Sequence, residues 1–64
     1  MTWGYRVVEF EDNWLEIAEV YYEDEEVVGH TASGVSVRGE SIEELRQVLK
    51  HMLDCLDKPI VKGI

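Results

Sequence analysis

Apolar and polar positions alternate along the first third of the chain as expected for β-strands. Residues 3–10, WGYRVVEF, are rich in aromatic and β-branched side chains and are followed by the turn-forming sequence EDN at 11–13. Residues 14–22, WLEIAEVYY, read as a second strand with apolar side chains on both faces: Leu15, Ile17 and Tyr21 on one, Ala18, Val20 and Tyr22 on the other. Because neither face is cleanly polar, the pattern indicates a sheet covered on both sides, or a bulge that switches the faces.

Four consecutive acids follow the second predicted strand: Glu23, Asp24, Glu25 and Glu26. They contain no glycine and lack the spacing of a calcium-binding loop, so the charged tip of a hairpin is favoured over a metal cage. A third strand is predicted from Val27 to about Val37, with bends at Gly29 and Gly34.

A helix is predicted to begin after Ser41 and to end near Asp57, ahead of Pro59. The sequence SIEE at 41–44 has the form of a capping box, in which the Ser41 hydroxyl accepts from the Glu44 amide and the Glu44 carboxylate accepts from the Ser41 amide. Apolar residues then recur at helical spacing: Ile42, Leu45, Val48, Leu49, Met52, Leu53 and Leu56. A helix of this length is marginal in water by itself, so the stripe is expected to pack on the sheet.

The predicted fold is α+β, a three- or four-stranded antiparallel sheet with one helix packed on one face. The order is βββα, or βββαβ if residues 59–64 contribute a short strand through Ile60, Val61 and Ile64. The chain reads as a single domain, residues 1–64. Because one helix covers only one face of such a sheet, we expect a homodimer formed through the sheet or by strand pairing at an edge.

Length and composition limit how the domain is stabilised and in which compartment it is expected. With 64 residues the domain buries a modest core and needs additional support, which disulfides cannot give because Cys55 is the only cysteine. A lone thiol without a signal peptide predicts a cytoplasmic protein. No apolar run approaches the roughly 20 residues of a membrane span.

The net charge of −8 comes from 14 acids and 6 bases that are unevenly placed. Between Val7 and Val37 there are nine carboxylates and no Lys or Arg. Such a surface disfavours nucleic acid and anionic membranes as partners and favours a basic protein. Plain solubility explains the same charge.

Several side chains have the chemistry of a site but not its spacing. Glu16 or Glu19 is placed to hydrogen-bond to Tyr5 or Tyr21 from the second strand, which predicts a structural contact rather than a catalytic acid. His51 and Cys55 stand four apart on the helix, yet no second pair of zinc ligands accompanies them. The stretch GVSVRG, residues 34–39, lacks the pattern of a phosphate-binding loop. No catalytic residue, metal ligand or cofactor is therefore assigned.

Residues 33–45, SGVSVRGESIEEL, resemble the most recognisable stretch of HicB-like antitoxin domains, a strand, a tight turn and a capped helix. Gly34 and Gly39 match the two glycines of that family, Ser41 its capping threonine and Glu44 its glutamate. The sequence departs from the family at Ser33 in place of proline, at Val35 in place of a frequent cysteine, and at Leu45 in place of alanine.

The resemblance implies a non-enzymatic binding module. HicB-like proteins neutralise HicA, a small basic RNA-cleaving toxin, and many carry a C-terminal DNA-binding region for which this sequence has no counterpart. A partner of that kind is expected to be attracted by acids at the predicted turns: Glu11, Asp12, Glu23, Asp24, Glu25 and Glu26. Three alternatives remain open, namely a dimeric small-molecule-binding domain, a hydrolase using Glu19 with His30 or His51, and a domain without an assignable function.

Overall fold

The computed structural model describes residues 1–62 and contains four strands and one helix. The elements are β1 (Thr2–Glu11), β2 (Trp14–Glu23), β3 (Glu26–His30), α1 (Ile42–Cys55) and β4 (Val61–Lys62). The α+β class and the order βββαβ agree with the sequence prediction. Ile64, which was also considered for the last strand, lies outside the described residues.

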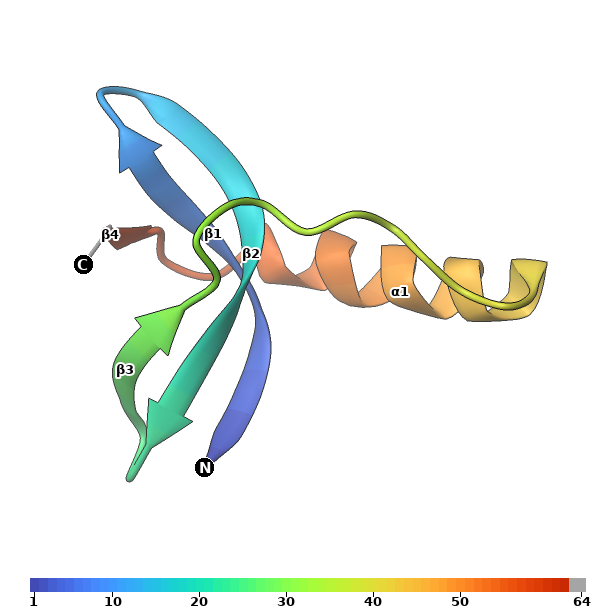
Figure 1. Cartoon of the computed structure of the whole chain (residues 1–64), viewed down its shortest axis with the longest axis horizontal. Coiled ribbons are helices and arrows are strands. Elements are labelled where there is room, and N and C mark those ends of the chain that lie inside the picture. The colour runs from blue at the N-terminus through green and yellow to red at the C-terminus, as the bar shows by residue number, and fades with distance from the viewer. Residues whose placement is uncertain (63–64) are drawn as a thin grey trace.

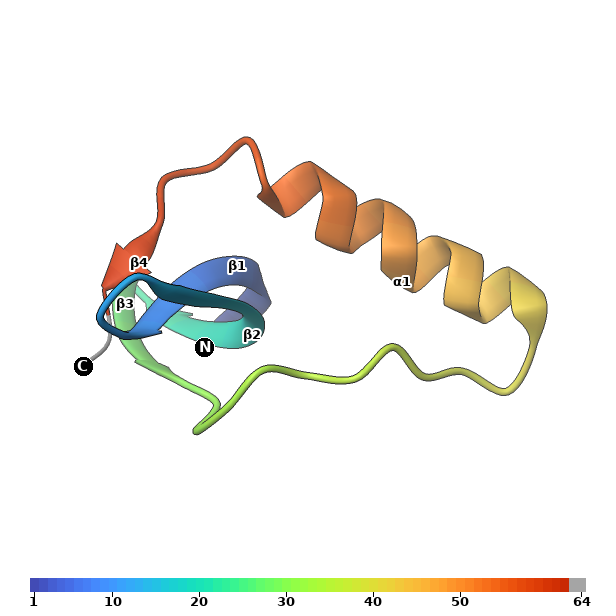
Figure 2. The same cartoon turned by 90° about the horizontal axis from the view of Figure 1, so that it is seen from above.

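The strand order in the sheet is β3-β2-β1-β4. β1, β2 and β3 form an antiparallel meander through two short turns, whereas β4 pairs parallel to β1 at Val8 and Glu9. The sheet is therefore mixed, not wholly antiparallel as predicted. The reason is that α1 lies between β3 and β4 and serves as the crossover that brings the chain back in the direction of β1. The strands curl strongly, as Figure 1 and Figure 2 show.

A cluster of completely buried side chains lies on one face of the curled sheet. Val8, Ala18 and Val20 are completely inaccessible. Phe10, Tyr22 and Val61 pack against them from β1, β2 and β4. This is the face of β2 that the alternation assigned to Ala18, Val20 and Tyr22, so the period-two pattern placed these side chains correctly.

β3 is shorter than predicted and ends at His30 instead of near Val37. The chain bends after Thr31, whose hydroxyl donates to the Ser33 carbonyl at 2.8 Å. It still follows the edge of β2: the amide of Thr31 donates to the Glu19 carbonyl at 2.9 Å, and that of Val35 to the Ile17 carbonyl at 3.0 Å. Two isolated backbone hydrogen bonds from the loop thus replace a regular ladder along this edge.

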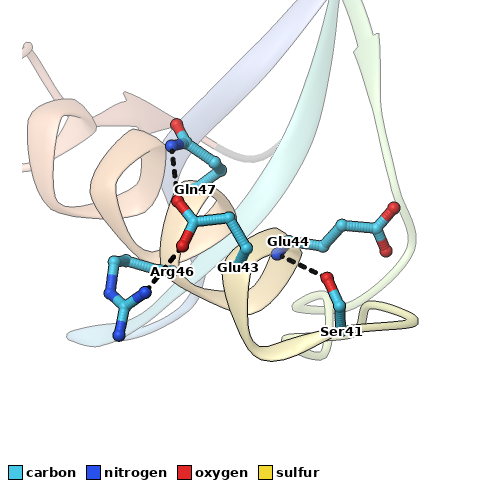
Figure 3. A network of polar contacts seen from close by, with 5 residues as sticks. All are labelled: Ser41, Glu43, Glu44, Arg46 and Gln47. Carbon is cyan, nitrogen blue, oxygen red and sulfur yellow. Dashed lines mark hydrogen bonds and ion pairs between the residues drawn. The ribbon is translucent and has the colours of Figure 1, made fainter.

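α1 begins at a capped N-terminus, shown in Figure 3. The Ser41 hydroxyl accepts from the Glu44 amide at 3.1 Å, as predicted. The reciprocal half of the box differs, because the Glu44 carboxylate accepts from the amide of Glu40 and not from that of Ser41. Glu43 accepts from Arg46 at 2.7 Å and from Gln47 at 3.4 Å on the exposed side of the first turns.

α1 packs against β1, on the opposite side of β1 and β2 from β3 and β4 (Figure 2). Only part of its apolar stripe is covered, contrary to the prediction: Met52 is buried together with Cys55, and Leu45 and Val48 are half-buried. The N-terminal turns extend beyond the sheet, as both views show. At the other end, the Arg6 guanidinium donates to the Pro59 carbonyl and joins β1 to the segment after the helix.

Candidate protein-binding surface

The six acids proposed as partner contacts lie at two separate hairpin turns. Glu11 and Asp12 belong to the β1–β2 turn, and residues 23–26 form the β2–β3 turn. The two turns are at opposite ends of β2, which has ten residues and would span about 30 Å if straight. The acids therefore form two distinct sites and not one continuous patch (Figure 1).

The β2–β3 turn is a two-residue hairpin closed by the pair Glu23 and Glu26. Its central residues, Asp24 and Glu25, have φ values of 52° and 68°. Two left-handed residues in succession are typical of a type I′ turn, which matches the twist of the flanking strands. All four acids are exposed, as expected for the charged tip of a hairpin.

The β1–β2 turn has a different character, because its acids border two adjoining depressions in the surface. One is lined by Glu9, Phe10, Glu11, Asp12, His30, Ala32 and Lys62, and the other by Phe10, Glu11, Trp14, Glu16 and Ala32. Together they are called the turn hollow. It combines carboxylates with aromatic rings, of which Trp14 is 61% exposed. The turn hollow thus offers both apolar contact and negative charge to a bound side chain.

Glu9 is an acid of the turn hollow that is paired with a cation of the same chain. Its carboxylate pairs with the Lys62 ammonium and accepts from the Asn13 amide at 3.3 Å. The hydrogen bond from Lys62 and then that from Asn13 lower the pKa of Glu9 below its ordinary value. Glu9 is consequently engaged with this chain's own cation, and Glu11 and Asp12 are the exposed acids that a partner would meet.

The two strand acids considered for catalysis make structural contacts. Glu16 accepts from the Trp14 indole at 2.9 Å and from the Gly34 amide at 2.8 Å. Glu19 accepts from the Tyr21 hydroxyl at 3.1 Å, one of the two contacts expected from the sequence. That hydrogen bond raises the pKa of Tyr21, because the phenol donates it only while protonated. Both carboxylates therefore organise β2 and its neighbours.

The histidines and the cysteine have different surroundings. His51 is exposed on α1, whereas Cys55 is 2% exposed, and burial raises the pKa of its thiol. His30 lies in β3, where its ring meets Phe10 edge-to-face at 5.4 Å and its Nδ1 is 2.7 Å from the Thr31 carbonyl oxygen. Among residues 1–62, no three His, Cys, Asp or Glu side chains are grouped to hold a metal ion.

The four residues that carry the HicB-like resemblance have structural roles. A Cβ at Gly34 would lie 2.4 Å from the Glu16 carboxylate, and one at Gly39 would lie 2.8 Å from Cβ of Glu44. Ser41 and Glu44 cap the N-terminus of α1: the Ser41 hydroxyl accepts from the Glu44 amide, and the Glu44 carboxylate accepts from the Glu40 amide. Close packing and capping thus explain all four.

Two residues of the turn hollow were missed by the sequence reasoning, Trp14 and Lys62. The pattern predicts Trp14 as a strand residue, which it is, and only its position directly after a turn indicates that it is exposed. Lys62 comes from the far end of the chain, and no local pattern pairs it with Glu9.

Comparison of the chain with known protein families, with curated proteins and with solved structures found no match. In the part of the chain that the structure describes, the helix is neither long nor apolar enough to cross a membrane.

Proposed function

We propose that this chain is a non-catalytic interaction domain that binds a small basic protein, and that the partner docks at the turn hollow. The observation that carries the proposal is the coincidence of exposed Glu11 and Asp12 with exposed Trp14 at one end of a base-poor sheet. Tryptophan is among the residues that contribute most to protein interfaces. Carboxylates around it attract and orient a Lys- or Arg-rich surface.

The HicB-like passage at residues 33–45 suggests the class of partner, an RNA-cleaving toxin of the HicA type. In this proposal, binding covers the toxin surface that holds RNA, because an acidic domain competes with the phosphate backbone for the same basic side chains. The β2–β3 turn contributes differently. Its acids lie far from the hollow and act through the long-range field that accelerates encounter.

The test is a binding measurement with a purified small basic RNase of the HicA type, followed by kinetics in increasing salt. Trp14→Ala and the pair Glu11→Gln with Asp12→Asn are expected to raise the dissociation rate at least about tenfold. The pair Asp24→Asn with Glu25→Gln removes the same charge from the other turn and serves as the matched control. It is expected to slow association without changing dissociation.

Hen lysozyme, a basic protein of unrelated fold, controls for unspecific attraction. The proposal requires tighter binding of the toxin than of lysozyme, and inhibition of RNA cleavage by the wild-type domain but not by the Trp14→Ala variant. Equal affinity for both basic proteins, or an affinity indifferent to ionic strength, would overturn it.

A further inference from the structure

The uncovered part of α1 is a continuous apolar stripe. Ile42, Leu49, Leu53 and Leu56 are 73%, 53%, 66% and 54% exposed. Their spacing of seven, four and three residues places them within about 60° of one another around the helix and along about 21 Å of its length. An exposed patch of this kind, four large aliphatic side chains without a polar residue between them, is typical of an interaction site.

The sheet does not offer a comparable surface. Its exposed apolar side chains are divided between two ends, with Trp14 and Leu15 at the β1–β2 turn and Trp3, Val27 and Val28 near the starts of β1 and β3. Leu15 pairs with Glu9, six residues along β1 from Trp3, so these groups are about 20 Å apart. Neither end of the sheet gathers four large aliphatic side chains in one continuous stripe, as the helix does.

The distribution of charge indicates what covers the stripe. Residues 1–37 carry nine acids and one base, which gives −8, and residues 38–64 carry five acids and five bases, which gives zero. The whole net charge thus belongs to β1, β2, β3 and the start of the following segment, and the part of the chain with the helix is balanced. A basic protein gains nothing from charge at α1, whereas a second copy of this acidic chain meets no net repulsion there.

We propose that a second copy of this chain docks on this stripe, with the two α1 helices antiparallel around a twofold axis near Leu49. Ile42 then packs against Leu56 of the partner subunit, and each Leu53 lies over the half-buried Leu45 of the partner subunit. An isologous contact of this kind uses one surface twice. The antiparallel arrangement opposes the helix dipoles and places the two acidic sheets at opposite ends of the helix pair, farther apart than the screening length of about 8 Å at physiological salt.

This inference is independent of the proposed function, since it uses a different surface and a different partner. The contact involves one helix from each copy, so its area belongs to the class below about 1,200 Å². Such a dimer dissociates on dilution. It also supports the protruding turns of α1, because a helix of 14 residues is marginally stable without a packed face.

Sedimentation equilibrium over a range of concentrations tests the dimer. The wild type is expected to dimerise, and Leu49→Glu with Leu53→Glu to raise the dissociation constant at least about 100-fold. Leu15→Glu alters a similarly exposed leucine on the sheet and is expected to leave the dissociation constant of the dimer unchanged. Added salt is expected to preserve the dimer, whereas it weakens binding of a basic partner, so the two proposals fail separately. A wild type monomeric at every concentration, or a dimer abolished by Leu15→Glu alone, would overturn the inference.

Disulfide trapping tests the geometry without relying on a disruptive variant. In a Cys55→Ala background, Ile42→Cys combined with Leu56→Cys is expected to give a covalent dimer on mild oxidation. Ile42→Cys alone is expected to stay monomeric, because each copy lies about 10 Å along the helix from the axis and the two copies are therefore about 21 Å apart. A covalent dimer from Ile42→Cys alone would show parallel helices and contradict the antiparallel arrangement. The absence of cross-linking in both variants would contradict the interface.

Discussion

The Glu16 carboxylate accepts a hydrogen bond from the backbone amide of Gly34 at 2.8 Å, and the space for a Cβ on Gly34 is occupied by that carboxylate. The contact joins β2 to the segment after β3, eighteen residues further along the chain. It requires a residue without a side chain at position 34 for reasons of room, since the residue's φ does not lie in the left-handed region. The glycine noted for its family resemblance is thus explained by a close approach.

Gly34→Ala is expected to destabilise the domain by about 1–3 kcal/mol, because the carboxylate must move and the Gly34 amide loses its acceptor. Urea unfolding measures the change. Gly4→Ala is the matched control, since a Cβ there meets nothing within 4 Å. It is expected to be neutral, or stabilising by up to about 1 kcal/mol through the unfolded state. Equal effects of the two substitutions would contradict the role assigned to Glu16.

Glu25→Gly is expected to stabilise the β2–β3 hairpin by about 1 kcal/mol, because glycine adopts a φ of 68° without the steric penalty that glutamate incurs. Thermal unfolding followed by circular dichroism measures the gain. Glu25→Gln removes the same charge and keeps the strained backbone, and its effect is expected to be clearly smaller. If the two variants gain alike, relief of charge repulsion and not of backbone strain is responsible.

Lys62→Gln is expected to return the pKa of Glu9 toward its ordinary value, since the Lys62 hydrogen bond is the largest cause of the lowering. A carboxyl whose folded pKa is lowered contributes stability above its unfolded pKa, and that contribution disappears as the pH falls through the folded pKa. Wild type and variant should therefore differ in stability at neutral pH and converge in acid.

Carboxyl carbon shifts of Glu9 followed by NMR give the pKa directly, and urea unfolding at neutral and acidic pH gives the stability difference. Lys50→Gln removes a lysine from α1 and is the charge-matched control. An unchanged Glu9 titration in Lys62→Gln would exclude the pair as the cause.

Cys55 is expected to react with iodoacetamide at least about tenfold more slowly in the folded protein than in the guanidinium-unfolded chain, because alkylation requires local opening of the helix. Burial adds to this protection by raising the pKa of the thiol, which lowers the fraction present as the reactive thiolate. Asp57→Cys in a Cys55→Ala background provides an exposed thiol nearby, expected to react at the unfolded rate. Rapid reaction of Cys55 in the native state would show that α1 is not held against β1.

Local signals in the sequence accounted for the elements that depend on neighbouring residues. The alternation in residues 14–22 placed Ala18, Val20 and Tyr22 on one face of β2, and the polar turns at 11–13 and 23–26 are formed. The Ser41 cap was predicted from a four-residue motif, since its hydrogen bond spans a single helical turn.

Contacts between distant segments were decided only by the tertiary structure. The parallel pairing of β4 with β1, the Lys62–Glu9 ion pair and the Arg6–Pro59 hydrogen bond each join residues that are more than fifty positions apart. No periodicity connects such positions, because a pattern reports only the face on which a side chain lies. The same limit applies to α1: its apolar stripe was evident in the sequence, but which half would meet β1 depends on the size and curl of the sheet. The other half, from Ile42 to Leu56, stays exposed because it runs along a side of the helix that is turned away from the buried Met52 and Cys55.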